Sequence, residues 1–195
     1  MGMPAGTRRW TAAEVRELQD ESRAWPRYEL IAGALLVTPA PRVAHQRAVS
    51  LLLMALAGYL DTETAGEVLT SPADIELEPE NITQPDVFVV PLTGGRRPRE
   101  WPDVKALLLA VEVLSPSNAE HDRWTKRIYY QGAGVPEYWV VDLDARAVER
   151  WRPGDDRPGI VRGSLQWKPA GALTTFALDL PRLFARVLDD DIAAG

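Results

Sequence analysis

The chain has 195 residues and a formal net charge of −6, with no cysteine and only two histidines. This length fits one domain with a sizeable core. The absence of thiols excludes a disulfide framework, a thiolate nucleophile and cysteine-ligated metals, and the acidic balance argues against a protein that coats nucleic acid through charge alone. No signal-peptide pattern or run of eighteen apolar residues occurs, so we expect a cytoplasmic protein without a membrane partner.

The N-terminal part of the sequence predicts a short helix, a hairpin and a long helix. Thr11 and Glu14 have the spacing of a capping box, which predicts a helix from there to about residue 22. Two apolar stretches around a glycine turn predict a β-hairpin over residues 28–37. Apolar residues at helical spacing predict the longest helix over residues 45–60.

The middle of the sequence predicts four strands and a helix. Residues 67–70 and 74–77 have the composition of short strands. Residues 86–90 and 107–114 are richer in β-branched and aliphatic side chains, which is typical of strands buried on both faces. A second capping box predicts a helix over residues 117–131.

The C-terminal part predicts strands over residues 137–142 and 147–151, weaker hairpin material over 161–176, and a terminal helix over 180–188. Helices therefore alternate with strands. Together with the strand–helix–strand unit over residues 107–142, this pattern indicates an α/β domain with a mixed sheet. If the two strands of that unit are parallel, their connection should be a right-handed crossover.

Two acidic residues occupy the most apolar strands. Asp86 opens one and Glu112 lies near the end of the other, where an ionised carboxylate is costly unless a cation or several donors meet it. Both carboxylates, with the backbone carbonyl of Val113, could bind Mg²⁺ or Mn²⁺, which prefer oxygen ligands. Lys126, on the next helix, would then hold a water near the metal, with its pKa lowered by the cation.

Each of these residues also has a purely structural interpretation. Asp86 follows a proline and could cap a turn while it opens its strand. Glu112 could form a buried salt bridge to an arginine. Asp122 and Lys126 are four residues apart on a helix, a spacing common for ion pairs on solvated faces. A structural ion-pair network without metal is therefore an alternative to a metal site.

Other polar residues could support the site. Glu29 in the predicted hairpin is either a further acidic site residue or an outward carboxylate, and His45 is either a site residue or a structural histidine at a helix start. Arg123 and Arg127 share a helical face with Lys126, where they could meet phosphates or belong to a solvated surface.

The Pro85-Asp86 pair, followed by a strand carrying Glu112, resembles the PD-(D/E)XK nuclease superfamily. A more specific resemblance, to the Uma-two group of restriction endonuclease-like proteins, spans residues 28–151. Asp122 and Lys126 belong to it. The remaining segments that carry it are 28–31, 45–46, 111–117, Tyr129 and 134–142.

This resemblance implies a restriction-endonuclease-like mixed β-sheet flanked by helices and Mg²⁺-dependent hydrolysis of phosphodiester bonds. Asp86 and Glu112 would be the metal ligands and Lys126 the catalytic lysine. The commonest superfamily motif places the lysine two residues after the acid, where this chain has Leu114. Lys126 is therefore the natural replacement, provided that its helix packs back over the strand end.

The resemblance also implies a nucleic-acid partner, in the first place DNA, and a homodimer, since a two-fold protein suits a two-fold duplex. We expect a single domain over residues 1–195, with 1–27 and 152–195 as peripheral elaborations. The main alternative function is a nucleic-acid-binding or regulatory protein of the same fold with little or no turnover.

Overall fold

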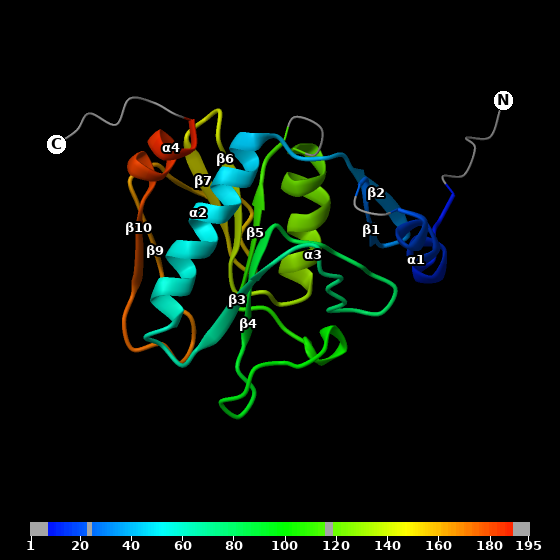
Figure 1. The fold of residues 1–195 in the computed structure, drawn as a ribbon, viewed down its shortest axis with the longest axis horizontal. Helices are drawn as coiled ribbons and strands as arrows, with labels where there is room; N and C mark the ends of the chain where they lie inside the picture. Colours follow the sequence, from blue (N-terminus) through cyan, green and yellow to red (C-terminus); the bar gives the residue numbers. More distant parts are fainter. Residues whose placement is uncertain (1–7, 23–24, 116–118, 189–195) are drawn as a thin grey trace.

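A six-stranded mixed sheet with helices on both faces forms the centre of the fold (Figure 1). The computed structural model describes residues 8–22, 25–115 and 119–188. Within these ranges the strand order is β3-β4-β5-β6-β7-β8. The predicted α/β architecture is confirmed. These strands are β3 (Gly66–Thr70), β4 (Val87–Pro91), β5 (Leu109–Val113), β6 (Tyr138–Asp142), β7 (Ala147–Trp151) and β8 (Gly159–Val161).

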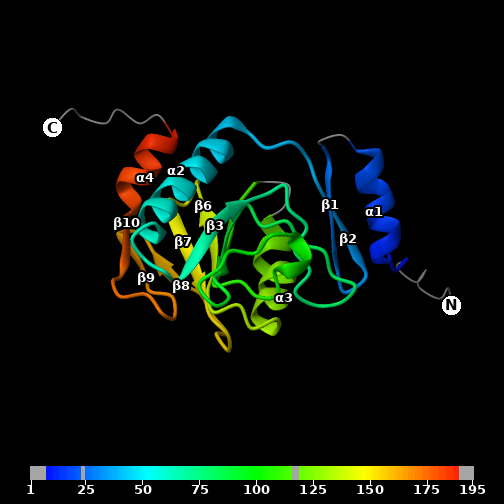
Figure 2. The same cartoon turned by 60° about the horizontal axis from the view of Figure 1, so that its bottom comes forward.

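Two smaller antiparallel sheets flank the central one: the hairpin β1–β2 and the pair β9–β10. Helices α2 and α4 cover one face of the central sheet, and α3 covers the other (Figures 1 and 2). The remaining elements are α1 (Ala12–Glu21), β1 (Arg27–Ile31), β2 (Ala34–Thr38), α2 (Val43–Leu60), η1 (Trp101–Asp103), the π-helical η2 (His121–Lys126), α3 (Arg127–Gly132), β9 (Ser164–Trp167), β10 (Phe176–Asp179) and α4 (Leu180–Leu188).

The N-terminal helix and hairpin form a unit with a small core of its own. The capping box is confirmed, because the Thr11 hydroxyl accepts from the Glu14 N–H and the Glu14 carboxylate accepts from the Thr11 N–H. The predicted hairpin is confirmed as well. A backbone bridge from Leu30 to Ile82 ties the unit to the loop before β4. Its core comprises Ala12, Val15, Leu30 and Ile82.

The central strands are buried on both faces, as their composition predicts. In β4, Val87 and Val89 belong to the hydrophobic core beneath α2 and α4, whereas Phe88 and Val90 belong to a second core on the opposite face. This division follows from the alternation of side chains along a strand. Every residue of β5 is buried, so a charged side chain in that strand has little access to water.

Helix α2 begins two residues earlier than predicted and packs one face on the sheet and α4. Among the helices of the described residues, it alone is long and apolar enough to cross a membrane by length and composition. Its inward residues recur at helical spacing and form part of the main core. They are Ala48, Leu52, Leu56 and Leu60.

The strand predicted over residues 74–77 is wrong. Only a single bridge forms there, between Ile75 and Thr83. The segment lies between Pro72 and Pro79, and proline cannot donate to a strand ladder. The chain between β3 and β4 is therefore a loop, which ends at Asp86.

The helix after β5 is confirmed in its described part, which runs from Ala119 through η2 to Gly132. The predicted cap at Ser117 lies outside the described residues. Strands β5 and β6 on either side of this helix are parallel, with Ala110 opposite Tyr138. The hairpin predicted over residues 161–176 corresponds to the antiparallel pair β9 and β10. The predicted terminal helix corresponds to α4.

The core contribution of α2 is testable with two substitutions on the same helix. Leu52 is completely buried, so Leu52→Ala is expected to lower the free energy of unfolding by about 2–5 kcal/mol. Met54 is 58% exposed, and Met54→Ala should change it by less than about 0.5 kcal/mol. Urea denaturation measures both. Equal losses would contradict the assigned orientation of the helix.

Candidate active site

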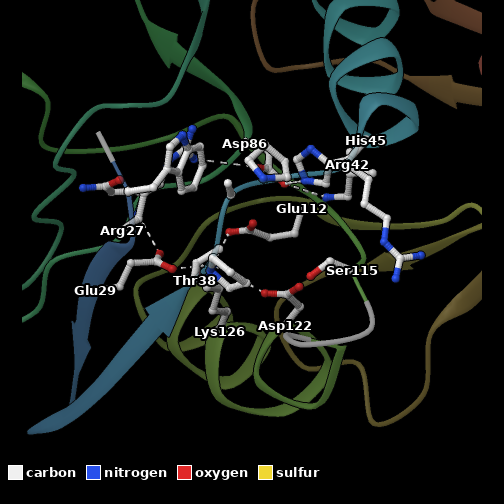
Figure 3. Close-up of a pocket in the computed structure, with 16 residues that line it drawn as sticks. Arg27, Glu29, Thr38, Arg42, His45, Asp86, Glu112, Ser115, Asp122 and Lys126 are labelled. Atoms are coloured by element: carbon white, nitrogen blue, oxygen red, sulfur yellow. Dashed lines mark hydrogen bonds and ion pairs between the residues drawn. The ribbon is translucent and has the colours of Figure 1, made fainter. Parts of the chain in front are cut away.

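A cavity of about 220 Å³ lies where β4 begins and β5 ends (Figure 3). The hairpin, the first turn of α2, both strand ends and η2 all contribute to its walls. Most of its side chains are polar or charged. Those labelled in Figure 3 are Arg27, Glu29, Thr38, Arg42, His45, Asp86, Glu112, Ser115, Asp122 and Lys126.

Strand register brings the two strand acids together. Strands β4 and β5 pair antiparallel with Val87 opposite Val111, and one further step of that register places Asp86 opposite Glu112. Directly opposed residues share a face of the sheet, here the face covered by α3. The Asp86 Oδ2 atom also accepts a hydrogen bond of 2.9 Å from the Val113 N–H. The backbone of β5 therefore holds the carboxylate from β4.

Lys126 is the centre of a buried cluster. Its Nζ atom lies 2.8 Å from Glu29 Oε2, 3.0 Å from Glu112 Oε1 and 3.4 Å from Asp122 Oδ1. Only 3% of Lys126 is exposed, so the interpretation of the Asp122–Lys126 pair as part of a solvated face is wrong. The helix does pack back over the strand end, as a lysine displaced from the common motif position requires.

The excess of acid over base shifts the pKa values of this cluster. Burial raises the pKa of Glu112 well above its usual range, and the nearby Asp122, Asp86 and Glu29 raise it further against the opposing effect of Lys126. Burial likewise raises the pKa of Asp122 to about 6. For Lys126, burial favours the neutral amine, but Glu112, Glu29 and Asp122 outweigh it and raise the pKa well above its usual range. The neighbouring carboxylates therefore favour the charged form of the lysine.

Asp86 has a different environment. Burial alone would raise its pKa, but the hydrogen bond and charge of His45 and the N–H of Val113 hold it below the usual range. The His45 Nε2 atom lies 3.0 Å from Asp86 Oδ2, and the Arg27 guanidinium lies 3.7 Å from Oδ1. The first turn of α2 therefore keeps one carboxylate of the cavity ionised.

Four carboxylates line the cavity and supply oxygen atoms of the kind that divalent cations prefer. Glu29, Asp86, Glu112 and Asp122 offer hard oxygen atoms in a buried space where Lys126 supplies the central positive charge. Among the described residues, no group of three or more acidic, histidine or cysteine side chains is placed so that it could hold a metal ion. Mg²⁺ does not require such a group, since it usually keeps several waters and binds through one or two carboxylates.

The two arginines predicted to meet phosphates are engaged within the protein. Arg123 donates at 2.6 Å to Asp142 and at 2.7 Å to Glu149. The Arg127 guanidinium lies 4.8 Å from the centre of the Trp151 ring. A phosphate at either arginine would have to compete with these partners.

Several residues of the cavity were not predicted from the sequence, and Arg27 and Gln84 are the most informative of them. Arg27 is two residues before Glu29 in β1, so the alternation of a strand could have indicated that both face the same side. Gln84 stands two residues before Asp86, and its N–H donates to Glu29 Oε1 at 2.7 Å. No local pattern marks a glutamine for this position.

A mixed sheet that largely buries acidic residues at the ends of two interior strands is typical of a restriction-endonuclease-like α/β protein. The family model Uma2, described as "Putative restriction endonuclease", matches residues 12–180, and the chain belongs to this family. The match extends beyond the resemblance over residues 28–151 to include α1 and the β9–β10 pair.

The fold is similar to that of a solved structure from Anabaena variabilis ATCC 29413, described as "a putative nuclease belonging to DUF820". The TM-score is 0.68 at 18% identity, over 89% of this chain and 98% of that chain. At this identity the similarity concerns the fold alone. No curated protein matches the chain.

The raised pKa of Asp122 predicts a pH-dependent cost of folding. The unfolded chain loses this proton near the ordinary pKa of 3.8 and the folded protein at about 6, so wild-type stability should fall as the pH rises between these values. The free energy of unfolding of Asp122→Asn relative to wild type should therefore increase by about 1–3 kcal/mol from pH 4 to pH 7.

Urea denaturation in EDTA measures this difference. The matched control is Asp144→Asn, which removes an exposed aspartate. Its difference from wild type should be the same at both pH values. A constant difference for Asp122→Asn would contradict the raised pKa.

Proposed function

We propose that this protein is a metal-dependent endonuclease that hydrolyses phosphodiester bonds of nucleic acid. The observation that carries the proposal is the buried Lys126 Nζ atom, which lies 3.0 Å from the Glu112 carboxylate in the cavity that Asp86 also lines. The family description and the nuclease described for the similar fold support the same class of reaction.

Asp86, Glu112 and the carbonyl of Val113 would hold the cation. When bound, Mg²⁺ or Mn²⁺ would polarise the phosphoryl group and lower the pKa of a coordinated water. The charged Lys126 amine has three donors. Two face Glu29 and Glu112, and the third would orient the attacking water or stabilise negative charge that develops on the phosphate. Glu29 and Asp122 fix the position of the amine from two further directions.

His45 and Arg27 contact Asp86, the proposed metal ligand from β4. The imidazole donates to one oxygen of Asp86 and so limits rotation of the carboxylate. Such outer partners orient metal ligands and are costly to remove. Arg27, on the Oδ1 side, adds positive charge on the path of an entering phosphate.

DNA as the substrate, a homodimer as the active form, one domain over residues 1–195 and a cytoplasmic location are parts of the same proposal. The first two rest on analogy with enzymes that cut two-fold-related duplexes, the single domain on the length of the chain, and the location on the sequence pattern. In a dimer, Arg123 and Arg127 would meet phosphates only after exchanging their internal partners.

Metal binding is the first test of this site. Mg²⁺ or Mn²⁺ should raise the melting temperature of the wild type, because a ligand that binds only the folded state stabilises it. Glu112→Gln should lose this rise, whereas the control Asp61→Asn, which changes an exposed acid, should retain it. A rise of equal size in Glu112→Gln would place the cation elsewhere.

Cleavage of single-stranded and duplex DNA and of RNA tests the chemistry. Asp86→Asn, Glu112→Gln and Lys126→Met should each lower the Mg²⁺-dependent rate by about 10²–10⁴-fold. Lys105→Met, which removes an exposed lysine, should keep the wild-type rate. Circular dichroism checks that each variant is folded.

The alternatives give different results in the same experiments. A binding or regulatory protein would show no cleavage and would retain nucleic-acid affinity after Lys126→Ala. A structural network would show no response to metal and would lose stability when Glu112 is changed. Either pattern in a well-folded wild type would overturn the proposed hydrolysis.

A further inference from the structure

A second cavity adjoins the candidate active site. Its volume is about 560 Å³, and it shares Trp25, Arg27 and Gln84 with the catalytic cavity. Tyr28 and Trp101 also line it, so three aromatic side chains surround a space next to the proposed metal ligands. We call this space the aromatic groove.

Gln84, which lines both cavities, carries a buried hydrogen-bond acceptor that lacks a donor among the described residues. Gln84 is 8% exposed, and its Nε2 atom donates to Asp74 Oδ1 at 2.7 Å. A carboxylate accepts only, so this contact fixes which end of the amide is nitrogen. The Gln84 Oε1 atom is buried and meets no donor among the described residues. Buried polar atoms usually have partners, so the orphan acceptor marks a place for an N–H group of a ligand.

The two tryptophans of the groove are held by neighbouring side chains, and Trp101 is also exposed. Trp101 is 43% exposed and packs against Phe88 with 6.3 Å between ring centres. The guanidinium of Arg27 lies 4.4 Å from the centre of the Trp25 ring, and the same side chain approaches Asp86 at 3.7 Å. Arg27 therefore connects the aromatic groove with the catalytic cavity.

We infer that the aromatic groove binds an unpaired nucleobase of the substrate next to the scissile phosphate. Trp101 or Trp25 stacks on the base, and Gln84 Oε1 accepts a hydrogen bond from an N–H on its Watson–Crick edge. Aromatic platforms of this kind bind single strands because every base has a π-face. A base within a duplex has that edge engaged and its faces stacked. This inference rests on the proposed function, and it specifies a single-stranded or locally opened substrate.

Binding to two strands of equal charge tests the inference. One is a fluorescein-labelled single strand of DNA, and the other has the same length with abasic residues in place of the bases. The affinity for each strand is measured by fluorescence anisotropy under two conditions that prevent cleavage. The first is the Glu112→Gln protein in Mg²⁺, and the second is the wild type in EDTA. Both should bind the base-bearing strand about 10-fold more tightly than the abasic strand.

Substitutions in the groove should remove this preference. Trp101→Ala and Gln84→Met are expected to bind both strands with the affinity of the parent for the abasic strand. The matched controls lie outside the groove: Trp124→Ala removes another exposed tryptophan, and Gln46→Met another glutamine. Both should keep the preference, and thermal melting checks the fold of all four.

Two results would overturn the inference. The first is that the parent protein binds the two strands with equal affinity or binds neither. The second is that the preference for the base-bearing strand survives both groove substitutions. The readout is binding rather than cleavage, so an inactive protein that retains the preference would contradict the proposed function and leave the base site intact.

Discussion

The site depends on one buried positive charge among several carboxylates. Lys126 lies within 3.4 Å of three acidic side chains in a space with almost no access to water. Removing one partner from a buried ion pair typically costs about 3–5 kcal/mol, because the remaining charge loses its compensation. The single amine does not balance the acids of the cavity. The pKa values of Glu112 and Asp122 are raised accordingly, because burial and the neighbouring carboxylates disfavour a further negative charge.

Ordinary rules of sheet geometry produce this arrangement. Alternation along β5 points Glu112 toward α3, and antiparallel register sets Asp86 opposite it. The π-helical turn η2 carries Lys126 back over the end of the strand. Irregular helical turns are frequent at functional sites because they re-aim a side chain without breaking the helix. The site thus lies where the strands end, while the middle of the sheet remains apolar.

The sequence predicts the central strands well, and with them the largely buried positions of Asp86 and Glu112 at the strand ends, because buried strands have a strong compositional signal. It predicts the strand over residues 74–77 wrongly, since a short apolar alternation resembles a strand even where only one bridge, between Ile75 and Thr83, forms. The sequence also does not indicate the contacts of Gln84. That residue matters through contacts with Glu29 and with the loop before it, which only the folded chain brings together.

The sequence positions of the cluster have a consequence for synthesis. Its members come from β1, the start of β4, the end of β5 and η2, so residues 29 to 126 must all be present before the charges meet. Contacts of such large sequence separation form late in folding. A nascent chain on the ribosome therefore carries no assembled cluster until η2 has emerged. Fragments that end before it would expose scattered carboxylates without the lysine that organises them.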